Sequence, residues 1–112
     1  MDIIVTTPKK DLENAQAETD SGEPYWFRRL PHKPVHLNIG DRVFYLSDGC
    51  IIGFARLLNI EEKPNGMQCS TTGKIWPPGW YLIIDAYSWT DIQPIPCRGF
   101  QGFKYFKASD ES

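Results

Sequence analysis

A chain of 112 residues fits one domain with a moderate hydrophobic core. Its hydrophobic fraction of 41% and aromatic fraction of 13% are typical of a folded globular chain, and nine Pro and nine Gly favour short strands and turns over long helices. The formal net charge of −2 excludes a strong overall attraction to nucleic acid or to an acidic membrane.

The first third of the chain predicts a strand, a helix and a second extended segment. Asp2 to Thr7 is expected to form a strand with an apolar centre. Thr7 followed by Pro8 is a helix start signal, with Thr as the N-cap and Pro at the first helical position. Lys9 to about Thr19 then predicts a short surface helix with a thin apolar face. Tyr25 to Leu30 is a dense aromatic and basic run, which fits either a strand or an ordered loop.

The middle of the chain predicts a hairpin, on which the rest of the fold depends. Val43 to Leu46 and Ile51 to Leu58 are apolar runs, joined by a Ser-Asp-Gly turn whose Gly49 tolerates positive φ. Gly53 indicates a bulge or a close backbone approach within the second strand. Both strands are apolar on both faces, so we expect them to be central in a sheet.

The last half predicts a polar connection and further strands. Glu61 to Lys74 is expected to be that connection. In a strand over Tyr81 to Trp89, strict alternation places Tyr81, Ile83, Asp85, Tyr87 and Trp89 on one face. Asp91 to Pro96 is extended because its prolines fix φ. Phe103 to Phe106 alternates as a last strand, and residues 109–112 are expected to be a disordered tail.

These elements predict a single domain over residues 1–108. Five or six short strands with one or two short helices give a mostly β (α+β) chain, and we expect a small β-barrel with a helix covering one opening.

The charges are segregated along the chain. Asp11 to Glu23 holds five acids and no Lys or Arg, whereas Arg28 to His36 and Arg98 to Lys107 each hold three bases and no acid. We predict that the two basic segments lie on one side of the molecule, opposite the acidic helix.

The order of these signals resembles the PUA-like superfamily of β-barrels, in particular its ASCH and EVE branches. A first strand ends in Thr-Thr-Pro and enters a helix, and a Trp-bearing segment leads to Leu37-Asn38-Ile39-Gly40-Asp41-Arg42-Val43-Phe44-Tyr45 and then to Ile52-Gly53-Phe54-Ala55. The resemblance implies a pseudo-barrel with a ligand cleft near Thr6, Thr7 and the segment from Trp26 to Arg29. Domains of this group mostly bind RNA or DNA, and several enclose one modified base.

Trp26 with Arg28 and Arg29 is the strongest candidate for a binding site. A flipped or single-stranded base can stack on an indole, while an arginine bonds a phosphate or a base edge. We expect the Trp26 indole to line an open cleft beside Thr6 to Pro8; the alternative is that Trp26 fills the core. The predicted nucleic-acid-binding residues are Thr6, Thr7, Trp26, Arg28, Arg29, Trp76, Lys104 and Tyr105.

Other chemistry has weaker signals. His32 and His36 have a spacing found in zinc sites, but no Cys pair precedes them, so we predict no metal. Cys50 follows the hairpin turn without an identifiable activating base. We therefore predict no catalytic residue and no cofactor.

Two other functions stay open. ASCH-type amidohydrolases act on a modified nucleoside and carry a Lys and a Thr three residues apart near the first helix; no Thr stands three residues after Lys9 or Lys10 here. A protein-interaction domain without nucleic-acid binding fits the negative net charge.

The sequence also predicts where the protein resides. The three cysteines form no Cys-x-x-Cys pair, which indicates reduced thiols. The N-terminal residues lack the pattern of a signal peptide, and no apolar run is long enough to span a membrane. We expect a cytoplasmic protein with no membrane partner, and nothing in the sequence indicates an oligomeric state.

Overall fold

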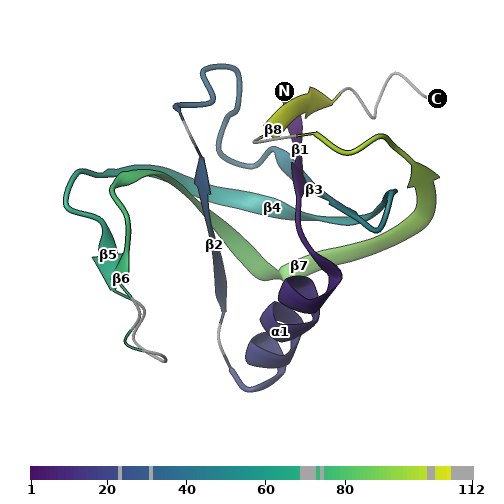
Figure 1. Cartoon of the computed structure of the whole chain (residues 1–112), viewed down its shortest axis with the longest axis horizontal. Coiled ribbons are helices and arrows are strands. Elements are labelled where there is room, and N and C mark those ends of the chain that lie inside the picture. Colours follow the sequence, from purple (N-terminus) through teal and green to yellow (C-terminus); the bar gives the residue numbers. More distant parts are fainter. Residues whose placement is uncertain (23, 31, 69–72, 74, 101–102, 107–112) are drawn as a thin grey trace.

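The computed structural model describes residues 1–22, 24–30, 32–68, 73, 75–100 and 103–106. Within them the chain is mostly β, as predicted, with one α-helix (Figure 1). Six strands form a mixed sheet in the order β2-β7-β4-β3-β1-β8, and β5 pairs with β6 in a small second sheet. The elements are β1 (Asp2–Thr6), α1 (Lys9–Asp20), β2 (Tyr25–Leu30), β3 (Arg42–Ser47), β4 (Cys50–Lys63), β5 (Met67–Gln68), β6 (Ile75–Trp76), β7 (Gly79–Pro96) and β8 (Phe103–Phe106).

The predicted hairpin is confirmed as β3 and β4, which lie at the centre of the sheet. Asp48 and Gly49 both have positive φ, 52° and 81°, the conformation of the tight turns that match strand twist. The ladder between β4 and β7 shifts register between Ile51 and Gly53, which confirms an irregularity at Gly53. The expected polar connection is partly strand, because β4 extends to Lys63 and β5 follows it.

The first strand has partners from distant parts of the chain. β1 pairs in parallel with β3, with Ile3 opposite Val43, and antiparallel with β8, with Val5 opposite Phe103. The last predicted strand is therefore confirmed as an edge strand of the main sheet.

The helix lies where it was predicted, from Lys9 to about Thr19, but its first turn is not capped by the Thr7 side chain. α1 begins at Lys9, and the amide of Leu12 donates to the Pro8 carbonyl at 3.1 Å. The Thr7 hydroxyl accepts a hydrogen bond from Arg28. A tertiary contact thus occupies the side chain that local sequence assigned to capping.

The predicted face of Trp89 is wrong. Phe54 pairs with Thr90 and Arg56 pairs with Asp85. One residue of β4 therefore lies between these two pairs, against four residues of β7, so the alternation along β7 breaks. The Ser88 hydroxyl donates to the Asp85 carbonyl at 2.7 Å and accepts from the Arg56 amide at 2.7 Å, which stabilises this bulge. Trp89 packs against the core, whereas Tyr87 is 64% exposed.

The sheet has two apolar faces, each with its own cluster. The inner face carries the larger one, to which both ends of the sheet contribute, since Trp26 and Leu30 of β2 and Phe103 and Tyr105 of β8 pack there. α1 covers this face with Leu12 and Ala15. The outer face carries Ile4, Phe44, Leu46 and Ile51, with residues of β7 and β8 against them.

The sheet curls around the inner cluster but does not close. Its edge strands β2 and β8 are the two ends of the ladder order, so a closed barrel is not confirmed. Side chains nevertheless connect the two edges of the sheet. The ring of His32, which follows β2, lies 5.0 Å from the ring of Phe103 in β8, and Arg28 of β2 donates to the Thr6 carbonyl of β1. The predicted tail, residues 109–112, lies outside the described residues, and no described helix has the length and apolarity needed to cross a membrane.

Candidate functional site

Alternation along β2 assigns its side chains to the two faces of the sheet. Trp26 and Leu30 are buried on the inner face, and Arg28 between them is half-buried. Tyr25 and Phe27 point outward and are 49% and 37% exposed. The sequence prediction that Trp26 and Arg28 share a face is confirmed.

Trp26 does not line an open cleft. Its side chain is only 7% exposed, which contradicts the expected exposure. The indole Nε1 donates to the Thr19 hydroxyl at 2.8 Å and to the Ala15 carbonyl at 3.2 Å. The indole ring packs on Tyr45 at 5.6 Å and on Trp89 at 5.7 Å between centroids. With its polar atom satisfied by α1 and its ring enclosed by aromatic side chains, Trp26 is a core residue.

Arg28 links β2 to the junction of β1 and α1. Its Nη2 donates to the Thr6 carbonyl at 2.7 Å and its Nη1 to the Thr7 hydroxyl at 3.2 Å. The Thr7 amide donates to the Leu46 carbonyl at 2.9 Å, which fixes the junction against β3. Thr6 is anchored as well, because its hydroxyl donates to the Phe100 carbonyl at 3.2 Å.

The charge of Arg28 has only neutral oxygens as hydrogen-bond partners among the described residues. None of the described acidic groups lies within 4.0 Å of its guanidinium. Burial lowers the pKa of Arg28, an effect that Tyr45 and Asp11 partly offset. Arginine nevertheless stays protonated at neutral pH. Arg28 is therefore a partly desolvated cation without a carboxylate partner among the described residues, an arrangement that favours an anionic ligand.

Tyr45 completes this group, which we call the Arg28 site: Thr6, Thr7, Arg28 and Tyr45. Tyr45 is 5% exposed, and burial raises its pKa although the charge of Arg28 opposes the rise. The phenol is therefore a neutral hydroxyl at physiological pH. Sequence reasoning assigned Tyr45 only to an apolar strand, and nothing in its local pattern distinguishes it from the neighbouring core residues.

The remaining predicted residues lie on the opposite face of β2 or on other strands. Arg29 is exposed on the outer face, and its Nε donates to the Pro78 carbonyl at 2.9 Å. Trp76 belongs to β6, and Figure 1 shows β5 and β6 at the far end of the molecule from the β1–α1 junction. Tyr105 lies on β8, where its hydroxyl accepts from the His36 amide at 3.0 Å.

The predicted single basic patch does not form from Arg28 and Lys104. Phe106 packs with the outer cluster and Lys104 alternates with Phe103 and Tyr105, which pack with the inner one. Lys104 is therefore on the outer face, whereas Arg28 is on the inner face. Lys107, at the end of the second basic segment, lies outside the described residues.

The described His, Cys, Asp and Glu residues include no cluster of three or more that could hold a metal ion. Comparison of the chain with protein-family models, curated proteins and solved structures found no match.

Proposed function

We propose that the chain is a nucleic-acid-binding module of PUA-like type and that the Arg28 site contacts RNA or DNA. The observation that carries the proposal is the half-buried guanidinium, held by the Thr6 carbonyl and the Thr7 hydroxyl without a carboxylate partner among the described residues. A phosphate oxygen, or an acceptor edge of an unpaired base, supplies the negative charge or lone pairs that this group lacks.

The geometry also supports pre-organisation. Two hydrogen bonds fix the guanidinium plane, so little side-chain entropy is lost when an anion binds. Arginine suits this role because its donors match phosphate and base edges in pairs. The stacking partner proposed from sequence changes, because Trp26 is enclosed; its place in this proposal is to hold β2 against α1.

The test is a fluorescence anisotropy titration of labelled single-stranded RNA and DNA oligonucleotides at several salt concentrations. We expect Arg28→Gln to weaken binding by about 1–3 kcal/mol, the usual range for a charge-assisted hydrogen bond. The slope of log Kd against log salt should fall by about one for each lost phosphate contact. Arg28→Lys keeps the charge and should recover only part of the loss.

The matched control is Arg29→Gln, one residue along the same strand but on the opposite face. It should leave the oligonucleotide affinity within about twofold. Thermal melts of both variants separate binding from folding. Wild-type protein that binds neither oligonucleotide in a salt-dependent way, or an Arg28→Gln variant that binds as well as wild type, contradicts the proposal.

A further inference from the structure

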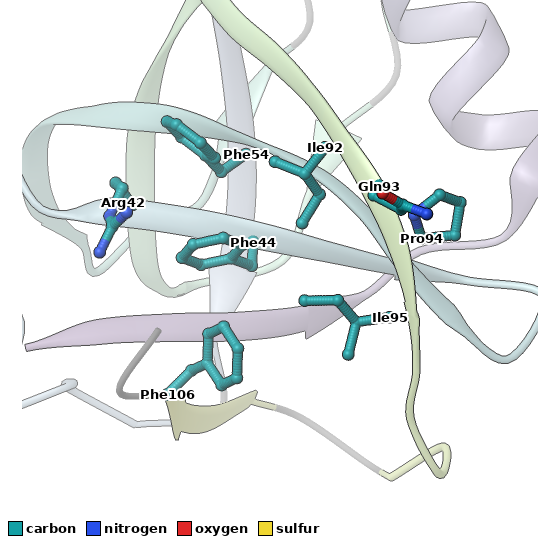
Figure 2. A pocket seen from close by; sticks show the side chains of 8 residues that line it. All are labelled: Arg42, Phe44, Phe54, Ile92, Gln93, Pro94, Ile95 and Phe106. Atoms are coloured by element: carbon teal, nitrogen blue, oxygen red, sulfur yellow. The ribbon is translucent and has the colours of Figure 1, made fainter. Parts of the chain in front are cut away.

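The outer face of the sheet carries a groove that is separate from the Arg28 site. Its volume is about 390 Å³, and Figure 2 shows the side chains that line it. The lining residues come from β3, β4, β7 and β8, and are Arg42, Phe44, Phe54, Ile92, Gln93, Pro94, Ile95 and Phe106. We call it the outer groove.

Three phenylalanine rings form the floor of the outer groove. Phe44 and Phe54 are directly opposite each other in the β3–β4 ladder, with ring centroids 5.2 Å apart. Phe106 meets Phe44 edge to face at 4.9 Å. Phe54 and Phe106 are only half-buried, and Ile95 at the wall is 38% exposed. The groove thus presents aromatic surface to solvent, and covering that surface is favourable.

An arginine is fixed at one end of this floor. Asp2 accepts from the Arg42 Nε at 3.0 Å and from its Nη2 at 2.7 Å, and the Arg42 amide donates to the same carboxylate. The guanidinium carbon lies 5.2 Å from the Phe44 centroid and 5.5 Å from that of Phe54. The ion pair with Asp2 therefore holds the guanidinium over the two rings, where it places a positive charge beside an apolar surface.

Two more cations border the outer groove. The Arg56 guanidinium lies 5.6 Å from the Phe54 centroid, and Arg56 is exposed. Lys104 is exposed on the same face as Phe106, two residues away in β8. Against these three cations stand two acids among the described residues: Asp2, which is already paired with Arg42, and Asp85, which is opposite Arg56 in the β4–β7 ladder. The rim of the groove is therefore net positive, although the whole chain is net negative.

We infer that the outer groove binds an acidic polypeptide segment of a partner protein. One aromatic or aliphatic side chain of that segment packs on the phenylalanine floor, and flanking carboxylates face Arg56 and Lys104. Charge complementarity selects this occupant, because the rim is basic and the floor is apolar. The exposed wall residues fit a chain that crosses an open surface, since small-molecule sites bury most of their ligand.

The test uses a short peptide in which Phe and Leu are flanked by Asp and Glu, added to the full isotope-labelled chain and followed by NMR. We expect chemical-shift changes at Phe44, Phe54, Ile95 and Phe106. A peptide with Lys and Arg in place of the acids, and one with Ser in place of Phe and Leu, should both bind at least about tenfold more weakly. Raising the salt concentration should weaken binding of the acidic peptide.

A pair of variants assigns the site. Ile95→Glu puts a carboxylate on the exposed wall and should weaken binding of the acidic peptide by about tenfold or more. Ile75→Glu is the control, because Ile75 is 75% exposed on β6, away from the groove. Lys104→Glu should weaken binding by a smaller factor.

Three results overturn the inference: equal binding of the basic peptide, an acidic peptide that Ile95→Glu does not affect, and absence of shifts at millimolar peptide. Shifts at the groove caused by an oligonucleotide instead of the peptide overturn it as well, and would assign the outer face to nucleic acid.

Discussion

Each face of the main sheet carries an arginine beside aromatic side chains. The two arginines differ in their hydrogen-bond partners, which are neutral oxygens for one and a carboxylate for the other. On the inner face, Arg28 is held by the Thr6 carbonyl and the Thr7 hydroxyl. This face also carries the core cluster that α1 covers. On the outer face, Arg42 is held by the carboxylate of Asp2, above the buried ring of Phe44 and the half-buried ring of Phe54.

The difference separates two uses of the same residue type. A cation with an internal counter-ion is a structural element, and its surroundings can remain open. A partly buried cation without a counter-ion carries an uncompensated desolvation cost, which an anionic ligand can offset. The inner face also holds the larger aromatic core. Substitutions there should therefore lower the free energy of unfolding much more than substitutions on the outer face.

The largest expected effect on this comparison comes from Trp26→Ala. Removing an indole that packs on Tyr45 and Trp89 should reduce the free energy of unfolding by about 3–5 kcal/mol, through the lost burial and the cavity left behind. Chemical denaturation measures it. The control, Tyr87→Ala on the exposed side of the β7 bulge, should change stability by at most about 0.5 kcal/mol. Equal effects of the two substitutions would mean that the inner face is not the main core.

A smaller effect is expected from Gly53→Ala. A Cβ on Gly53 would lie 2.8 Å from Cη2 of Trp89 and 2.7 Å from the carbonyl oxygen of Thr90. The indole cannot move freely, because its Nε1 donates to Asp91 at 2.8 Å and its ring packs on Tyr45. We expect a loss of about 1–3 kcal/mol, as for overpacking in other cores.

The control for Gly53→Ala is Gly99→Ala, where an added Cβ meets nothing within 4 Å. That variant should melt with the wild type. A neutral Gly53→Ala variant would show that Trp89 is not fixed against β4, and would weaken the account of the bulge in β7.

The smallest expected effect concerns the outer face. Asp2→Asn removes the counter-ion of Arg42 and should cost about 1 kcal/mol, because the pair is partly exposed to water. It should also loosen the arginine over Phe44 and Phe54, which NMR of the Arg42 side chain can detect. Glu61→Gln, in the more exposed pair with Lys63, should cost less. A loss for Asp2→Asn as large as that for Trp26→Ala would remove the distinction between the faces.

The hairpin, the helix and the last strand could be predicted because their signals are local. A Ser-Asp-Gly turn between apolar runs specifies β3 and β4 whatever surrounds them. The exposure of Trp26 could not be predicted in this way, since it depends on Thr19 and Ala15 reaching the indole from α1. Strict alternation places Trp89 on the wrong face because it does not account for the four residues of β7 between Asp85 and Thr90, which lie against one residue of β4.

At the two arginine sites, too, local sequence predicts the residues of one strand or hairpin but not the contacts that the fold adds. Local sequence placed Arg28 beside Trp26, but only the curl of the sheet brings Arg28 to Thr6 and Thr7. The outer groove had a signal that was missed: Arg42 and Phe44 on one strand, and Phe54 and Arg56 on the next, alternate at a spacing of two and pair across the hairpin. Its completion by Phe106 depends on β8, which no local pattern places beside β1.

The position of β1 between β3 and β8 also has a consequence for the order in which the fold is assembled. As the chain leaves the ribosome, residues 2–6 emerge before either neighbour, and their hydrogen-bonding partners follow about 40 and 100 residues later. Pairings so distant in sequence close large loops, which slows folding. Until Phe103–Phe106 has been synthesised, one side of β1 keeps unpaired amides and carbonyls. The nascent chain therefore passes through a state with an exposed strand edge that can pair with other chains.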